Sequence, residues 1–316
     1  MADDLTPSQE PRVSKGDWRA ELAHVGEQRG FYEEIGAEHT GLFVRGEGAG
    51  AKTLIVTFEN LDHVFEGADD RMPWGYDFVT SRGWSMLGMM AHGWTWYRDE
   101  HVFDFFDRLQ AEGFFEQFDN VVFYGASMGG YAASVFCAAA PGSTAILLSP
   151  QATLSRDVAP WETRYRKAWA RSYSGRYAYG PDQVENANRV HLFYDPREPL
   201  DAMHAALFRG HNITKYYCRF MGHRIASLWM RMGVLKQVVM GCVDGTMNRQ
   251  MFYKLMRARL LTVRYQQEML RRLQKLDRPW LIANYTRAVL NTRRGPKFRR
   301  ALAKAEAQLT AQKRGK

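Results

Sequence analysis

The sequence predicts an α/β protein built on a mostly parallel β-sheet that is flanked by helices. Short apolar runs of strand length alternate along the chain with helical stretches, and this alternation is typical of parallel sheets covered on both faces. A glycine-rich turn at residues 125–129 joins one apolar run to the helix after it. A basic stretch with helical periodicity follows the last predicted strand and forms a C-terminal extension.

The strands are predicted from apolar, β-branched runs bounded by turn-forming residues. The first two runs, 30–35 and 40–45, are close enough to form an antiparallel hairpin. The remaining strands are predicted at 53–58, 83–89, 120–124, 144–148, 190–194 and 213–218. Helical spacing of apolar residues predicts helices at 99–109, with Asp99 as the capping residue, at 130–140, at 199–209, and from residue 225 nearly to the end of the chain.

Charge and composition divide the chain into three parts. Residues 1–18 are expected to be a flexible polar tail, 19–245 the α/β domain, and 246–316 a basic helical extension. Residues 250–316 hold 18 Lys and Arg but three acids, a net charge of +15, whereas the other residues sum to −6 within a total of +9. Within the domain, residues 151–188 are polar, aromatic and basic, as in an insertion. The asymmetry indicates a polyanionic or membrane-surface partner.

Other features exclude several classes of protein. The three cysteines, Cys137, Cys218 and Cys242, have spacings that match neither a metal knuckle nor a CxxC motif, which argues against a disulfide scaffold or a zinc site. No run of about 18 apolar residues could span a bilayer, and the N-terminal residues lack the apolar core of a secretory signal. We therefore expect a cytoplasmic protein that uses no metal and no cofactor.

The glycine-rich turn Gly125-Ala-Ser-Met-Gly129 has the pattern G-x-S-x-G. A nucleophile at the tip of a sharp strand-to-helix turn needs strained backbone angles and small neighbours two residues away on each side. The flanks fit, because an apolar strand precedes the turn and a helix rich in small residues follows it. The alternative is a turn that only permits close packing or cradles a phosphate group.

On these residues the sequence resembles the α/β-hydrolase superfamily. The resemblance rests on Tyr124-Gly-Ala-Ser-Met-Gly-Gly130 and on the order of strands and helices, and it covers roughly residues 30–238. It leaves out the N-terminal tail and the basic extension. In this superfamily the catalytic groups occur in the chain order serine, acid, histidine. The resemblance therefore implies that Ser127 is the nucleophile.

The resemblance also implies a base and an acid beyond the last strands. His223 follows the strand at 213–218 and is expected to be the general base, with His211 as its rival. Asp195 follows the strand that ends at Tyr194 and is expected to orient His223, with Glu198 and Asp201 as competitors. The alternative for Asp195 is a turn-forming Asp-Pro, and Asp201 is also expected in the first turn of the next helix, where an acid is favoured.

The oxyanion hole of this superfamily uses two backbone N–H groups. One is expected from Met128, the residue after the nucleophile. The second is expected from the loop after the strand at 53–58, at Phe58, Glu59 or Asn60. The sequence here is Thr-Phe-Glu-Asn rather than the lipase-type HGGG pattern, so the residue that supplies the second donor stays open.

The insertion carries aromatic residues at a spacing of four, with basic residues between them. Trp161, Tyr165, Trp169, Tyr173 and Tyr177 would form one stripe on a helix. The stripe would pack the insertion onto the domain, or else Trp161, Tyr165 and Trp169 would line a substrate site. Apolar residues in the extension also recur at helical spacing. That face would dock on the domain or on another subunit, or bind an anionic membrane surface. No nucleic-acid motif occurs, so nucleic acid is not an expected partner.

The leading hypothesis for function is a serine hydrolase that cleaves an ester, or a thioester or amide, through an acyl-enzyme on Ser127. Its substrate would be a small-molecule, glycan or acyl ester. An acyltransferase would use the same three residues with a different acceptor. A third hypothesis is a catalytically inactive or accessory protein with the same fold that binds a glycan, a membrane or a protein.

Overall fold

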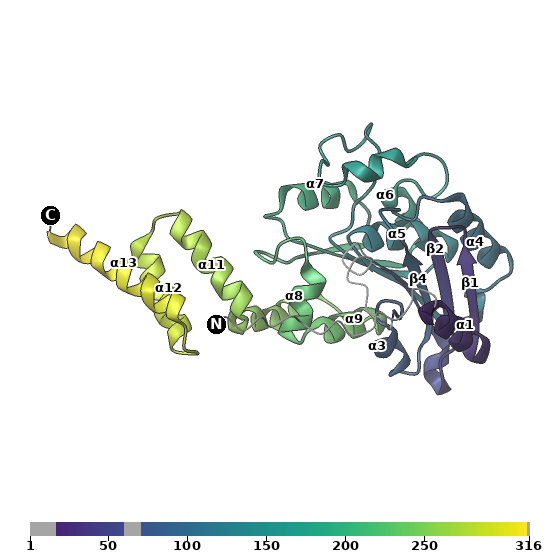
Figure 1. Ribbon diagram of the computed structural model, residues 1–316, viewed down its shortest axis with the longest axis horizontal. Helices are drawn as coiled ribbons and strands as arrows, with labels where there is room; N and C mark the ends of the chain where they lie inside the picture. The colour runs from purple at the N-terminus through teal and green to yellow at the C-terminus, as the bar shows by residue number, and fades with distance from the viewer. Residues whose placement is uncertain (1–16, 60–70, 315–316) are drawn as a thin grey trace, which may run out of the picture.

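The computed structural model describes residues 17–59 and 71–314 (Figure 1). Its centre is one eight-stranded sheet in the order β1-β2-β4-β3-β5-β6-β7-β8. β2 pairs antiparallel with β1 and β4, and every other pair is parallel. The strands are β1 (Gly30–Ile35), β2 (His39–Val44), β3 (Thr53–Phe58), β4 (Ser85–Ala91), β5 (Asn120–Ala126), β6 (Thr144–Leu148), β7 (Arg189–Tyr194) and β8 (Ile213–Tyr217).

Helices cover both faces of this sheet. One face packs in a large core against α4 (Glu100–Ala111), α5 (Met128–Phe136) and α7 (Pro199–Leu207). The other face packs against α3 (Tyr76–Thr80), α8 (Ile225–Met232), α9 (Leu235–Val243) and α10 (Arg249–Leu255). The central strands β3, β5 and β6 are almost wholly buried, as strands covered on both faces must be. The predicted α/β architecture is confirmed.

The predicted elements agree with the structure to within a few residues. The hairpin of β1 and β2 forms, and β3 and β6 have the predicted bounds. β4 begins and ends two residues later than predicted, and α5 begins two residues earlier, directly after Ser127. Asp99 caps α4 as expected, because its side chain accepts a hydrogen bond from the N–H of His101.

One helix was missed at the N-terminal side of the sheet. α1 (Asp17–Arg29) packs beside β1 and β2, where Leu22 is buried against Leu42, Val44 and Met90. Its buried side is made by Trp18, Leu22 and Val25, which have helical spacing. The predicted tail over 1–18 overlaps the start of this helix, and residues 1–16 lie outside the described part of the chain.

The insertion after β6 is an irregular loop and not the predicted aromatic helix. Its longest regular piece between residues 151 and 179 is the 3₁₀ turn Arg166–Ala170. The buried Arg98 guanidinium donates hydrogen bonds to the carbonyl groups of four loop residues, namely Ser172, Ser174, Arg176 and Tyr177. One side chain therefore satisfies carbonyl groups that a helix would have satisfied internally, and the loop folds against the domain without helical hydrogen bonds.

The C-terminal residues are helical, as predicted. α10 and the 3₁₀ turn Met256–Leu261 place Phe252 and Met256 in the core beside Trp229. After them, α11 (Val263–Lys275), α12 (Pro279–Leu290) and α13 (Pro296–Arg314) share a small core of their own. Figure 1 shows these three helices projecting from the sheet domain. Within the described residues, no helix combines the length and apolarity needed to cross a bilayer.

Candidate active site

Ser127 is the single residue between β5 and α5, at the carboxyl edge of the sheet. Its backbone has φ 52° and ψ −116°, a conformation that costs a residue with a side chain on the order of 1–3 kcal/mol. Two hydrogen bonds of 2.9 Å hold it there: Ser127 N–H donates to the Leu148 carbonyl, and the Ser127 carbonyl accepts from Tyr131 N–H. The turn keeps the serine in the strained conformation that the motif predicts.

The two glycines of the motif are required by space rather than by unusual backbone angles. A Cβ atom on Gly125 would lie 2.0 Å from the Gly129 carbonyl oxygen, and one on Gly129 would lie 2.3 Å from the Phe58 carbonyl oxygen. Both distances are far inside van der Waals contact and involve backbone atoms, which cannot move aside alone. The motif therefore brings β5, α5 and β3 closer together than any larger residue allows.

Replacing Gly125 by alanine should lower the free energy of unfolding by about 1–3 kcal/mol or more, because the backbone must shift to admit the methyl group. Urea unfolding followed by circular dichroism measures the change. Gly130→Ala is the matched control, because its Cβ would meet Pro150 at 3.2 Å, a contact that small shifts relieve. Equal destabilisation by the two substitutions would contradict the steric account.

The strand order, with only β2 running against the others, and the sharp turn from β5 to α5 give the arrangement that the resemblance implies. The chain has an α/β-hydrolase fold. Its carboxyl edge carries Ser127 after β5, Asp195 after β7 and His223 after β8.

Ser127 and His223 are in direct contact. His223 Nε2 lies 2.9 Å from Ser127 Oγ. The other ring nitrogen, Nδ1, lies 3.0 and 2.9 Å from the two carboxylate oxygens of Asp201. Because an ionised carboxylate only accepts hydrogen bonds, it favours the tautomer with the proton on Nδ1. Nε2 is then free to accept the hydroxyl proton of Ser127.

The expectation that Asp195 contacts His223 is wrong. Asp195 is buried, and its two oxygens accept hydrogen bonds from the backbone N–H groups of Arg197 and Gly222, at 2.9 and 2.8 Å. The first of these bonds makes an Asx-turn, the alternative that the Asp-Pro pair indicated. Asp195 therefore fixes the loop that carries His223, and the first turn of α7 brings Asp201 to the imidazole.

Arg164, from the insertion, holds the carboxylate of Asp201 from its other side. Arg164 Nη1 lies 2.7 Å from Asp201 Oδ1 and 3.5 Å from His223 Nδ1. Burial alone would raise the pKa of Asp201, but the hydrogen bond from His223 and the charge of Arg164 outweigh it and hold the pKa below its usual value. Asp201 is thus kept ionised beside the imidazole.

A second buried carboxylate, Glu162, fixes Arg164 in turn. Arg164 Nε lies 3.0 Å from both oxygens of Glu162, and Glu162 also contacts His204 Nε2 at 3.1 Å. His204 Nδ1 accepts from the N–H of Ala152 at 3.1 Å, so its proton is on Nε2 and points at Glu162. Burial opposes ionisation, yet the hydrogen bonds from His204 and Arg164 lower the pKa of Glu162 to about 2. Both ends of this network, Ala152 and Glu162, lie in the insertion, so His204 fixes the insertion to α7.

Two further side chains reach the serine hydroxyl. Gln151 Nε2 lies 3.4 Å from Ser127 Oγ, and Gln151 Oε1 accepts from Trp96 Nε1 at 3.1 Å. Because Trp96 can only donate, it fixes which end of the Gln151 amide faces the serine. Tyr165 OH lies 3.1 Å from His223 Nε2 and 3.5 Å from Ser127 Oγ. Burial raises the pKa of Tyr165, which favours its neutral, donating form.

The backbone N–H groups expected to form the oxyanion hole differ in whether they are already engaged in hydrogen bonds. Met128 N–H is the first of α5 and has no acceptor among the described residues, as an oxyanion donor requires. Phe58 is the last residue of β3, paired with both β4 and β5. Glu59 N–H already donates to the Met89 carbonyl at 3.3 Å. Asn60 lies outside the described residues.

The three aromatic candidates of the insertion lie in different places. Tyr165 OH lies 3.5 Å from Ser127 Oγ. Trp161 packs on the ring of His204 with 4.5 Å between centroids. Trp169 is partly buried against the main core, with Arg156 and Arg166 over its ring. Only Tyr165 is brought to Ser127 and His223, so the prediction that all three share one face is wrong, because the segment is not a helix.

Sequence reasoning missed the residues that surround these side chains: Trp96, Gln151, Glu162, Arg164 and His204. They come from loops after β4 and β6 and from inside α7, and no motif or fixed spacing connects them. Backbone strain marks the same region, since Trp96 and Ser149 have φ of 46° and 45°. Among the described residues, no group of three or more His, Cys, Asp or Glu is arranged to hold a metal ion.

Comparisons with known proteins add solved structures of similar architecture. No family model matches the chain, and no curated protein matches it. A capsule O-acetyltransferase of Neisseria meningitidis serogroup A is 13% identical with a TM-score of 0.41, covering 65% of this chain and 94% of that one. An esterase/lipase from an uncultured bacterium is 17% identical with a TM-score of 0.46, covering 77% of this chain and 93% of that one. An esterase of Pyrobaculum calidifontis is 12% identical with a TM-score of 0.44, covering 77% of this chain and 96% of that one.

Proposed function

We propose that the protein is a serine hydrolase that cleaves esters through an acyl-enzyme on Ser127. One observation carries the proposal: His223 Nε2 lies 2.9 Å from Ser127 Oγ while Nδ1 of the same ring lies 2.9 Å from Asp201. This is the arrangement that lets a neutral imidazole take a serine proton and a buried carboxylate stabilise the resulting imidazolium. Had the serine and the histidine been out of reach, the accessory hypothesis would have been favoured.

In the proposed reaction, Ser127 Oγ attacks the ester carbonyl carbon while its proton passes to His223 Nε2. The carbonyl π electrons move to the oxygen, which becomes the oxyanion of a tetrahedral adduct. His223 then gives the proton to the leaving alkoxide oxygen as the carbon–oxygen bond breaks. Water, or a hydroxyl acceptor in a transfer reaction, attacks the acyl-enzyme with His223 again as base. The bond between the acyl carbon and Ser127 Oγ then breaks as His223 returns the proton to Oγ. Thioester and amide cleavage would follow the same steps.

The oxyanion would be stabilised by Met128 N–H and by the side-chain amide of Gln151. Glu59 N–H is engaged by the Met89 carbonyl, so the usual second donor is not supplied by that residue. The Gln151 amide points its N–H groups at Ser127 Oγ and is held there by Trp96. Since the oxyanion forms on the carbon bonded to Oγ, a donor 3.4 Å from Oγ is within reach of it.

Removing the Gln151 donor should lower kcat by about 10²- to 10³-fold with little change in KM, because the bond is made to charge that develops in the transition state. Gln151→Met is the informative variant, since it keeps the length of the side chain and lacks the N–H. Stopped-flow or steady-state release of p-nitrophenol from p-nitrophenyl acetate measures it. A kcat within about twofold of the wild type would exclude this role.

Hydrolysis of p-nitrophenyl acetate also tests the proposed function. Wild-type protein should release p-nitrophenol, and His223→Ala should lose that activity while remaining folded by circular dichroism. His211→Ala is the matched control, because His211 is exposed on the loop before β8. Wild-type activity no higher than that of His223→Ala would contradict the proposal. Product analysis with added alcohols then separates the two fates of the acyl group, since transfer yields a new ester and hydrolysis the free acid.

A further inference from the structure

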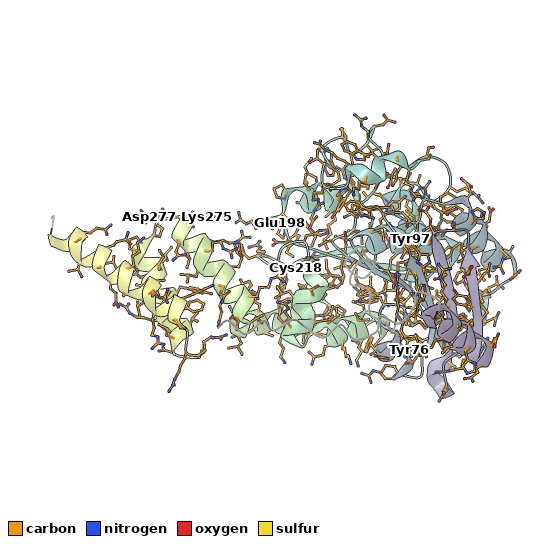
Figure 2. The ribbon with its side chains drawn as sticks, in the orientation of Figure 1. Tyr76, Tyr97, Glu198, Cys218, Lys275 and Asp277 are labelled. Atoms are coloured by element: carbon orange, nitrogen blue, oxygen red, sulfur yellow. The ribbon has the colours of Figure 1, made fainter. Side chains whose placement is uncertain are left out.

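The arm formed by α11, α12 and α13 (residues 263–314) carries an exposed apolar turn. At the α11–α12 connection, which we call the apical turn (residues 276–281), Leu276 and Trp280 are each 64% exposed and Leu281 is 40% exposed. Pro279 is the first residue of α12 and Asp277 has a positive φ of 44°, so the chain reverses sharply here. Figure 2 shows Lys275 and Asp277 at this end of α11, away from the sheet domain.

Of the other large apolar residues of the arm, Val263 at its start is 39% exposed, and most of the rest pack inside the arm. Leu270, Ile282, Val289 and Phe298 are buried in the arm's own core, so the arm has already satisfied its internal packing. The apical turn contributes to none of the described cores. Three large apolar side chains within six residues, one of them a tryptophan, leave an apolar tip without a partner inside the chain.

The arm that carries the apical turn is strongly basic. The arm has 14 Lys and Arg against three acids. Exposed Lys275 directly precedes the apical turn and exposed Arg278 lies within it. A groove of about 340 Å³ between α11 and α13 is lined by Arg271, Lys297, Arg300 and Lys304. Among the described residues, Lys297, Arg300 and Lys304 have no carboxylate within ion-pair distance, because Glu268 pairs with Arg271 and Arg272 and Glu306 with Arg287.

We propose that the arm docks on an anionic lipid surface, with the apical turn inserted among the headgroups and the cations of the arm over the lipid phosphates. Exposed tryptophan and leucine beside lysine and arginine suit the interface of a bilayer, where an apolar layer lies beneath a negatively charged one. A soluble polyanion would engage the cations but leave Leu276, Trp280 and Leu281 in water. A second arm would bring like charges together. Of these three partners, only an anionic bilayer can bind both the cations of the arm and the exposed apolar side chains of the apical turn.

Co-sedimentation of the full chain with vesicles tests this proposal. The protein should bind vesicles of equal parts phosphatidylcholine and phosphatidylglycerol, should not bind phosphatidylcholine alone, and should bind less as salt is added. Joint replacement of Leu276, Trp280 and Leu281 by serine should weaken binding at least about tenfold. Joint replacement of Lys297, Arg300 and Lys304 by glutamine should weaken it about 10²-fold. Val158→Ser, at an exposed apolar residue of the sheet domain, should bind like the wild type.

Further measurements distinguish the lipid surface from the two alternative ligands of the arm, a soluble polyanion and a second copy of the arm. Circular dichroism and turnover of p-nitrophenyl acetate should be unchanged in the serine variant of the apical turn, so a failure of this proposal is distinct from a failure of the ester chemistry. Unchanged vesicle binding by that variant would overturn the proposal, and equal loss of heparin and vesicle binding by the glutamine variant would then indicate a soluble polyanion. A lipid-independent dimer, abolished by the serine variant in sedimentation equilibrium, would overturn it in favour of self-association.

Discussion

Replacing Ser127 by alanine should lower kcat for p-nitrophenyl acetate by about 10⁶-fold, to the level left by binding and the oxyanion donors alone. The alanine lacks the oxygen that forms the acyl-enzyme, so the proposed two-step path is closed. The initial burst of p-nitrophenol, equal to the amount of enzyme when deacylation is slow, should disappear with it. Initial-rate and burst measurements on the same samples give both numbers.

The control for that substitution is another serine of the same region. Ser174 is exposed on the insertion loop and contacts only Ser172 among side chains of the described residues. Ser174→Ala should keep the wild-type burst and rate. If Ser127→Ala retained kcat within about tenfold of the wild type, the nucleophile would be a different group and the proposed mechanism would be wrong.

The second large effect concerns the acid. Asp201→Asn should lower kcat by about 10⁴-fold, because an amide no longer fixes the proton on Nδ1 of His223 or stabilises the imidazolium. Asp195→Asn should act on the fold instead. An amide oxygen can still accept from one of the two N–H groups that Asp195 now binds, so the loss of the other should lower the free energy of unfolding by about 1–3 kcal/mol. Kinetics and urea unfolding on both variants measure the contrast.

The two substitutions differ in their effect on kcat, and this makes the assignment of the acid testable. Folded Asp195→Asn should keep kcat within about tenfold of the wild type, whereas folded Asp201→Asn should lose about 10⁴-fold in kcat, whatever each substitution does to the unfolding midpoint. The reverse pattern would return Asp195 to the role expected from its place after the strand that ends at Tyr194.

The sharp turn at Ser127 could be predicted from sequence because its constraint is local. The small residues at 125 and 129 and the apolar strand before them are all visible within ten residues, and the structure shows why each glycine is needed. The contact between Ser127 and His223 was also anticipated, since a parallel sheet gathers the residues that follow its strands at one edge.

The expected contact between Asp195 and His223 is wrong because three carboxylates, Asp195, Glu198 and Asp201, lie within seven residues and the choice among them depends on three-dimensional packing. Asp195 is directed to two backbone N–H groups, and Asp201, which sequence placed correctly in the first turn of α7, faces the imidazole. The spacing of residues in the sequence does not reveal that the N–H groups of Arg197 and Gly222 bind Asp195. The Asx-turn signature of Asp-Pro was the available signal.

The structure of the insertion was also not predictable from the periodicity of its sequence. Aromatic residues every four positions indicated a helix, but Arg98, more than 70 residues earlier in the chain, binds the carbonyl groups of the segment and stabilises a loop. Such a long-range partner overrides local periodicity. The same loop brings Arg164 to Asp201 and Tyr165 to His223, so a segment with little regular structure supplies contacts that the sequence could not predict.

Mass spectrometry of the protein after reaction with a fluorophosphonate tests whether Ser127 is an activated nucleophile. Fluorophosphonates phosphonylate a serine that an adjacent base activates. We expect one adduct per chain, mapped by peptide sequencing to Ser127 and absent from His223→Ala. An adduct on another residue, or no adduct in folded wild-type protein, would contradict the account.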